Sequence, residues 1–204
     1  MEAMENRTQQ LVAESVAGAG GFVAVDDAGE FTFYPSEAAL LADFEYTAEA
    51  ICIVGRDGGG FRLVLDAERK LAMSTGLGPV DFSWLRQAWL RAQRDNPAHY
   101  PLRRFYPAGR DTLLACLFET LYLENALEAV EWQLLMNGTE THPVTLRDVD
   151  ARLGARDSLE HARVRDPFGH HYRPVRVPGH PARSGGRHGN VTIYAEIAEA
   201  VRGA

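Results

Sequence analysis

Lysine is almost missing from this chain of 204 residues, because Lys70 is the single lysine beside twenty arginines. Such a bias is typical of a GC-rich genome and indicates no particular recognition chemistry. Cysteine is scarce as well. Cys52 and Cys116 lie among large apolar neighbours and have no C-x-x-C spacing. We therefore expect two buried free thiols rather than a disulfide or a metal site.

Long hydrophobic runs are also absent. No window reaches the roughly 18 uncharged apolar residues that suggest a membrane-spanning helix. The first five residues lack the basic segment and the following apolar stretch of a signal peptide. We expect a cytoplasmic protein with no membrane partner.

The chain lacks the short motifs that carry well-known chemistry. It contains no G-x-S-x-G, P-loop, G-x-G-x-x-G or zinc signature. The sequence therefore predicts no catalytic residue, no metal ligand and no cofactor, and it favours a protein without enzymatic activity.

Two runs of alternating apolar residues give the clearest structural signal. Residues 22–34 and 51–66 each alternate around a turn that contains glycine, which is typical of β-hairpins with one buried face. Between them, Ser36 can cap a helix over residues 36–45. These patterns predict a hairpin–helix–hairpin part over residues 22–75, with a fifth strand near residues 71–73.

Residues 80–162 are predicted to form a helical part. Asp81 or Ser83 can cap a first helix that ends before Asn96-Pro97. Residues 111–136 are apolar on most sides and stop at an Asn-Gly pair, which predicts one helix of about 39 Å. This helix would be the centre of the core.

Three glutamates, Glu124, Glu128 and Glu131, share one face of this predicted helix. A di-iron bundle would require a Glu-x-x-His motif on such a helix, whereas residue 131 is glutamate. We interpret the three as a solvated acidic face.

A short helix is expected after Thr145, where Asp148 completes a pattern like a capping box. Residues 145–163 also have an outline of a helix-turn-helix. However, Asp150 and Glu160 are charged at positions where the two helices would have to pack. DNA binding is therefore the weaker alternative, and the net charge of −7 also opposes it.

Residues 163–190 combine four histidines, six arginines and four prolines, and they predict an exposed basic loop. The histidine spacings match no zinc motif. Histidine and arginine could together receive a phosphate or an acidic surface. The candidates for such an anion or ligand loop are His170, His171, Arg173, His180, Arg187 and His188. After the loop, Asn190 can cap a C-terminal helix over residues 191–204.

Charge is divided unevenly along the chain. Residues 1–50 hold ten acidic residues and one basic residue, whereas residues 151–204 hold nine basic and five acidic residues. Such polarity can orient a charged partner. The predicted surface for a partner protein consists of Asp26, Asp27, Glu30, Asp43, Glu45 and Glu49.

Together these patterns predict one α+β domain over residues 1–204. A small antiparallel sheet of two hairpins would pack against a helical half with one long central helix.

One stretch resembles a known family. FTFYPSEAAL over residues 31–40, followed by Phe44-Glu45-Tyr46 and the hairpin over residues 51–66, resembles the front half of small actinobacterial immunity proteins encoded beside secreted polymorphic toxins. The resemblance implies a cytosolic inhibitor without catalytic activity that neutralises a cognate toxin by binding and occluding it.

Two alternatives of other classes stay open. The first is an uncatalogued enzyme or small-ligand binder that uses the histidine and arginine loop, with a site built from His99, His170, His171 and nearby acids. The second is the DNA-binding regulator, which would require residues 145–163 to present a basic helix.

Overall fold

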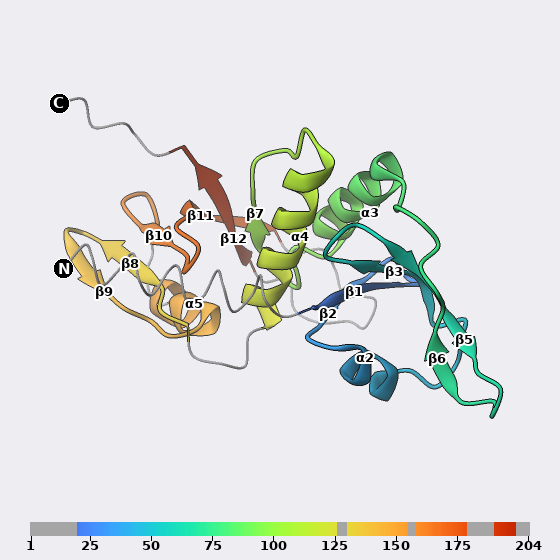
Figure 1. Cartoon of the computed structure of the whole chain (residues 1–204). Coiled ribbons are helices and arrows are strands. Elements are labelled where there is room, and N and C mark those ends of the chain that lie inside the picture. The colour runs from blue at the N-terminus through green and yellow to red at the C-terminus, as the bar shows by residue number, and fades with distance from the viewer. Residues whose placement is uncertain (1–19, 126–129, 155–157, 179–189, 199–204) are drawn as a thin grey trace, which may run out of the picture. The chain divides into compact units, whose positions relative to one another are not determined.

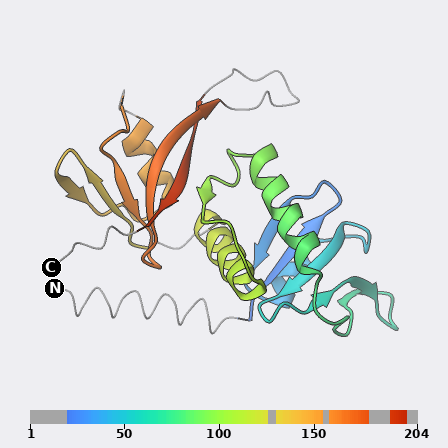
Figure 2. The same cartoon turned by 90° about the horizontal axis from the view of Figure 1, so that it is seen from above.

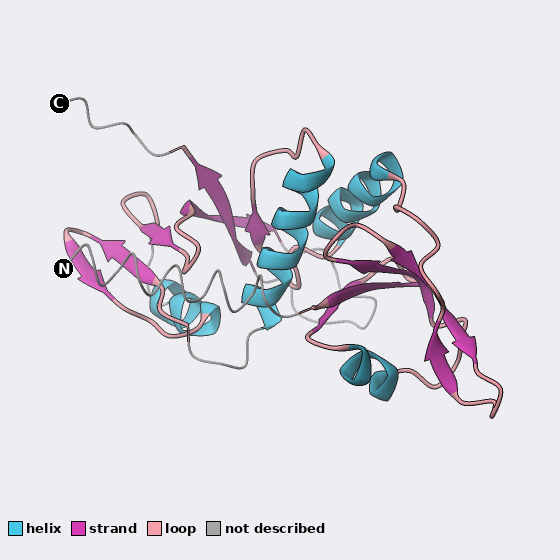
Figure 3. Cartoon of the chain, viewed as in Figure 1, coloured by secondary structure: helices cyan, strands magenta, loops and turns pink. Residues whose placement is uncertain are grey.

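The computed structural model describes residues 20–125, 130–154, 158–178 and 190–198 (Figures 1 and 3). They form helices and mainly antiparallel sheets, which confirms the α+β class. The described residues separate into two compact units. The N-terminal unit contains residues 20–94 and 106–122, and the C-terminal unit contains residues 95–105 and those from 123 onward. A single domain over the whole chain stays a prediction.

The N-terminal unit is built on a four-stranded antiparallel sheet with the order β2-β1-β3-β4. Its strands are β1 (Phe22–Asp26), β2 (Phe31–Tyr34), β3 (Ala50–Gly55) and β4 (Gly60–Phe61). β1 pairs with β2 through one hairpin turn, and β3 pairs with β4 through the other. The first predicted hairpin is therefore confirmed, and the second is confirmed as far as Phe61.

The second alternating run is divided at Arg62. β5 (Leu63–Leu65) leaves the four-stranded sheet and pairs with β6 (Leu71–Met73) in a separate two-stranded sheet. Ser74 fixes the divide, because its N–H donates to the Arg62 carbonyl at 2.8 Å and its hydroxyl accepts from the Arg62 N–H at 3.1 Å. The predicted fifth strand exists.

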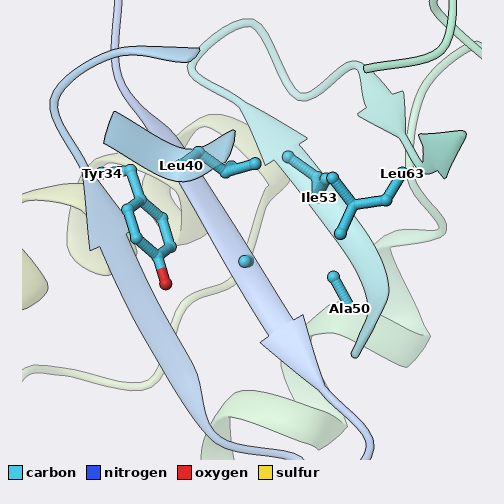
Figure 4. Close-up of a cluster of buried hydrophobic side chains, with 6 residues drawn as sticks. Tyr34, Leu40, Ala50, Ile53 and Leu63 are labelled. Atoms are coloured by element: carbon cyan, nitrogen blue, oxygen red, sulfur yellow. The ribbon is translucent and has the colours of Figure 1, made fainter. Parts of the chain in front are cut away.

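Helices cover both faces of the four-stranded sheet. α3 (Phe82–Asp95) and α4 (Arg110–Asn125) lie over one face, and α2 (Glu37–Asp43) lies on the other (Figures 1 and 2). On the α3 and α4 face, the rings of Phe31 and Trp89 are 5.2 Å apart. On the α2 face, a core cluster forms around Leu40 (Figure 4). Its buried members are Ala24, Tyr34, Leu40, Ala50, Ile53 and Leu63.

Side-chain caps set the helix starts. The Ser36 hydroxyl accepts from the Ala39 N–H at 3.1 Å, and an Asp81 carboxylate oxygen accepts from the Trp84 N–H at 2.6 Å. Each cap satisfies a backbone donor that the first helical turn leaves unpaired. The predicted starts of α2 and α3 are confirmed.

The long helix predicted over residues 111–136 is wrong. α4 ends at Asn125, and residues 133–136 form strand β8 (Gln133–Met136), which pairs with β9 (Thr139–Thr141). Asn137 and Gly138 both have positive φ, of 51° and 79°, as a two-residue hairpin turn requires. The Asn-Gly pair that was interpreted as a helix stop is therefore a hairpin turn.

The C-terminal unit is built on a six-stranded sheet with the order β7-β12-β11-β10-β8-β9. The strands not yet named are β7 (Leu102–Arg103), β10 (Arg163–Arg165), β11 (His171–Pro178) and β12 (Asn190–Ile197). Only the β7–β12 pairing among these described strands is parallel. α5 (Leu146–Gly154) lies on one face, where Asp150 accepts from the Tyr194 hydroxyl at 2.5 Å. The structure thus contains a second sheet that the sequence patterns did not predict.

Thr145 caps α5 as predicted. Its hydroxyl accepts from the Asp148 N–H at 3.1 Å and donates to the Asp148 carboxylate at 2.8 Å. The second helix of a helix-turn-helix is wrong, however, because residues 158–162 lead through a turn into β10.

The exposed loop over residues 163–190 and the helix over residues 191–204 are also wrong where the structure describes them. β11 and β12 pair without interruption from His171↔Ile197 to Pro178↔Asn190. Apolar residues alternate at Val175 and Val177 of β11 and at Val191, Ile193, Ala195 and Ile197 of β12, which favours a pleated sheet over a helix. Residues 179–189 and 199–204 lie outside the described part of the chain.

Replacing Leu40 by alanine is expected to lower the free energy of unfolding by about 2–5 kcal/mol, because the side chain is fully buried in the core cluster. The matched control is Leu77→Ala, since Leu77 is 58% exposed and its loss should cost less than about 0.5 kcal/mol. Urea unfolding followed by fluorescence measures both values. Equal losses in the two variants would contradict the placement of α2 against the sheet.

Candidate functional site

The strand register brings two separate connections to one end of the four-stranded sheet. β1 ends at Asp26 and β3 begins at Ala50, and these two residues are directly paired. The turn from β1 to β2 and the segment from α2 to β3 therefore meet at this end. The six predicted partner-binding residues lie on these two segments, and they are Asp26, Asp27, Glu30, Asp43, Glu45 and Glu49.

Asp26 holds the β1–β2 turn in shape. Its Oδ1 accepts from the Glu30 N–H at 2.8 Å, and its backbone N–H donates to the Glu30 carbonyl at 3.1 Å. Gly29 adopts a φ of 81°, which glycine reaches without steric cost. The Asp26 carboxylate is thus a structural group, and the turn displays Asp27 and Glu30, both exposed.

Glu49 performs the same task in the second connection. Its Oε2 accepts from the N–H groups of Glu45 at 2.7 Å and Tyr46 at 2.8 Å. A carboxylate that accepts two backbone hydrogen bonds fixes the local conformation of the chain. Glu45 and Tyr46 are consequently presented from an ordered turn.

Asp43 is also occupied within the protein. Its Oδ2 accepts from the Tyr34 hydroxyl at 2.5 Å. Burial, then Asp43 and, to a lesser extent, Asp26 raise the pKa of Tyr34 above its ordinary value, so that the phenol stays protonated and remains a donor. The effect of both carboxylates on one hydroxyl also places Asp26 and Asp43 in the same electrostatic environment.

Four of the predicted residues are exposed, namely Asp27, Glu30, Asp43 and Glu45. Because Asp43 accepts from the Tyr34 hydroxyl, we assign Asp27, Glu30 and Glu45 to the binding surface. Beside them Tyr46 is 66% exposed and Ile51 is 48% exposed. We call these five residues the acidic end. The sequence over residues 20–55 contains seven acidic residues and no lysine, arginine or histidine, so no cation of this segment neutralises them.

An exposed tyrosine and isoleucine beside carboxylates can contact a protein surface of opposite charge. Tyrosine is enriched at the centres of protein interfaces, and charged groups around such a centre set orientation and association rate. Among the described residues, no group of three or more histidine, cysteine, aspartate or glutamate side chains is placed to hold a metal ion.

His170, one of the residues predicted for an anion or ligand loop, belongs to a cluster of polar side chains in the C-terminal unit. The turn from β10 to β11 begins with Asp166, whose side chain is buried. Its Oδ2 accepts from Arg104 Nη2 at 3.2 Å and from the Tyr172 hydroxyl at 2.8 Å. Burial raises the pKa of Asp166, and Arg104 and His170 oppose this effect.

His170 lies at the end of the same turn, and its side chain contacts Glu196 on β12. Its Nδ1 lies 2.8 Å from Glu196 Oε1, and Glu196 Oε2 accepts from the Phe105 N–H at 2.5 Å. Burial acts to raise the pKa of Glu196, but the hydrogen bonds from His170 and Phe105 outweigh it, and the pKa lies below its usual value. A histidine oriented by a carboxylate is an arrangement that general bases use. Here both carboxylates also hold backbone groups, which indicates a structural clamp.

The other predicted histidine and arginine residues are not gathered into one loop. His171 and Arg173 lie on β11, and His99 packs against Tyr100 with ring centroids 4.6 Å apart. His180, Arg187 and His188 lie outside the described residues. As a binding site this set stays a prediction.

The prediction of a solvated acidic face is wrong at Glu124. Its Oε1 accepts from the Leu102 N–H at 3.0 Å, and Oε2 is shielded from solvent without a hydrogen-bond partner. Burial raises the pKa of Glu124 to about 8, against the lowering effects of the Leu102 N–H, Arg103 and Arg104. Glu131, by contrast, is exposed and lies 2.8 Å from His142, and Glu128 lies outside the described residues.

The prediction of two buried free thiols is confirmed in part. Both Cys52 and Cys116 are free, and Cys116 is buried in α4, whereas Cys52 is half-buried in β3. No helix in the described part of the chain has the length and apolar character needed to cross a membrane.

Comparisons with protein-family models, curated proteins and solved structures found no match to this chain.

Glu124→Gln should alter how stability depends on pH. In the folded protein the pKa rises from 4.5 to about 8, so between these values unfolding releases a proton and stability falls as pH rises. The glutamine variant lacks this loss. Its free energy of unfolding should rise relative to wild type by up to about 1.4 kcal/mol per pH unit from pH 5 to 8.

Urea unfolding at several pH values measures this difference, with Glu68→Gln as the control because Glu68 is exposed in the β5–β6 turn. A difference between Glu124→Gln and wild type that is constant with pH would contradict a protonated, buried Glu124.

Proposed function

We propose that this chain is a cytoplasmic protein-binding module without catalytic activity, and that its acidic end binds a basic surface of a partner protein. The observation that carries the proposal is the pairing of Asp26 with Ala50. It brings Asp27, Glu30 and Glu45 to the end of the sheet where Tyr46 and Ile51 are exposed.

Preorganisation of the acidic end supports binding. Asp26 and Glu49 hold the two connections through hydrogen bonds of 2.7–2.8 Å to backbone N–H groups. A partner would meet carboxylates that are already positioned, so less conformational entropy is lost on association. Residues 20–55 hold seven acidic residues and no lysine, arginine or histidine, and acidic groups gathered in this way favour approach of a basic surface.

The partner class that we propose is a secreted toxin domain, which the chain would neutralise by occlusion as a cognate immunity protein. This step rests on the resemblance of residues 31–66 to such proteins. An inhibitor of this kind requires a rigid surface and no catalytic group. The β1–β2 turn and the connection from α2 to β3 are the rigid elements at the acidic end, because Asp26 and Glu49 hold them by hydrogen bonds.

A second candidate is a small-ligand binder or enzyme centred on His170. It is favoured by one observation, the contact of His170 Nδ1 with Glu196 at 2.8 Å. Substituting His170 by asparagine would separate the candidates, because a protein-binding function at the acidic end should not depend on it.

Charge reversal at the acidic end should weaken partner binding. In Asp27→Lys/Glu30→Lys/Glu45→Lys, Asp26 and Glu49 are kept so that both turns stay formed. The protein is co-expressed with the products of neighbouring genes, and a protein retained in comparable amount is identified and its binding kinetics measured. The variant should associate at least about tenfold more slowly at low salt and lose most of its salt dependence.

The control is Glu68→Lys/Glu131→Lys/Glu160→Lys, which changes the net charge equally at exposed positions that do not belong to the acidic end. It should bind nearly as wild type does. If both triple variants weaken partner binding equally, the loss would come from net charge alone. That result would contradict a defined binding surface. Retention of no partner by the folded wild type would count against the proposed function itself.

A further inference from the structure

One face of the six-stranded sheet in the C-terminal unit is left without a helix among the described residues. α5 packs against the face that carries Tyr194, Tyr172 and Val164, all of which are buried. Residues that alternate with these point to the opposite side, which we call the outer face. Cross-strand pairs define it as Arg163↔Leu135, Arg165↔His171, His171↔Ile197, Arg173↔Ala195, Val175↔Ile193 and Val177↔Val191.

The outer face is apolar for a surface. None of its paired residues named above is buried, although most carry aliphatic side chains. Leu135 is 42% exposed. An antiparallel sheet with one solvated face normally shows polar residues there. Leu135 is thus the exposed apolar residue of the outer face, and the valines and isoleucines of β11 and β12 are half-buried. Apolar side chains that stay partly accessible on a sheet face favour a contact surface there.

Three arginines lie at one end of these apolar residues. Arg163 and Arg173 are exposed, and Arg165 is half-buried beside them. Arg165 Nη1 donates to Gln133 at 3.4 Å, and its buried Nε has no hydrogen-bond partner. Glu140, which pairs with Leu135, is the acidic residue of this face. The face as a whole therefore favours an anionic occupant.

An acidic polypeptide fits this face better than a nucleic acid. Guanidinium groups bind carboxylates in a bidentate manner, and aliphatic side chains pack against apolar residues of a protein. Single-stranded nucleic acid requires aromatic side chains for stacking, and none of the outer-face residues named above is aromatic.

The chain itself carries a surface of the required chemistry. The acidic end combines three exposed carboxylates with Tyr46 and Ile51, and the outer face combines exposed arginines with Leu135 and the valines and isoleucines of β11 and β12. Each surface has the charge that the other lacks, and both present apolar side chains. This complementarity identifies a second copy of the chain as the occupant.

We propose that the acidic end of one copy binds the outer face of the next. This inference rests on the acidic end being a protein-binding surface, as proposed above. Because two different patches meet, the contact is heterologous, and successive copies form a ring or an open chain rather than a twofold dimer. A copy engaged in this way would have its acidic end covered and would be closed to another basic partner.

Two charge-reversed variants test the contact, and each removes one surface. The first is Asp27→Lys/Glu30→Lys/Glu45→Lys, and the second is Arg163→Glu/Arg173→Glu. Sedimentation velocity is recorded at low salt over about a hundredfold range of concentration. The wild-type mass should rise with concentration and return to that of a monomer near 0.5 M salt, where charges are screened within about 4–5 Å.

Each variant alone should remain a monomer, since it keeps only one of the two surfaces. Their equimolar mixture should form a one-to-one complex that cannot extend, because one intact acidic end meets one intact outer face. The control is Arg147→Glu/Arg152→Glu, which makes the same change of charge at exposed positions of α5. It should associate as wild type does, and circular dichroism verifies that each variant is folded.

A wild type that stays monomeric at every concentration would overturn the inference, and so would a mixture of the two variants that forms no complex. Equal loss of association in the α5 control would also overturn it. The proposed function is tested separately, by the binding of a different protein to the acidic end. That binding should not change in Arg163→Glu/Arg173→Glu, so a failure of the inference leaves the proposed function standing.

Discussion

The pairing of β1 with both of its neighbours is the constraint on which the acidic end depends. β1 is flanked by β2 and β3, and its register with β3 sets Asp26 opposite Ala50. The register shifts between Val25 and Asp26, and before this shift Val23 lies toward the α3 and α4 face and Ala24 toward α2. A slip of one residue in the pairing of residues 22–25 would exchange the two faces of β1.

Carboxylates have two distinct roles in this protein. Those with hydrogen bonds to the chain, such as Asp26, Glu49 and Asp166, hold turns in place. Those displayed by these turns, such as Asp27 and Glu45, are exposed and available for contact. Net charge alone does not separate the roles, but the hydrogen bonds do. The same distinction makes the charge-reversal variants informative, because they leave the structural carboxylates unchanged.

The sequence predicted elements whose signals are local, including the first N-terminal hairpin, the second as far as Phe61, and the capped starts of α2 and α3. It failed where distant pairing decides. The apolar run near residues 133–136 satisfies a helix or a strand equally well. Residues 171–178, with histidine, arginine and proline, were predicted as an exposed loop, and only their pairing with β12 makes them a strand. Charge identified the exposed carboxylates of the candidate site. The exposure of Tyr46 and the structural role of Glu49 could not be predicted, since both depend on the fold around them.

Zero-length cross-linking tests the central claim most directly. A carbodiimide joins carboxylates to lysine amines that they touch, and Lys70 is the only lysine of this chain. Products with lysines of a captured partner therefore report contacts between the two proteins. The account predicts that Asp27, Glu30 and Glu45 dominate these products. Cross-links that arise instead from exposed acids such as Glu68 or Glu160 would contradict the acidic end as the binding surface.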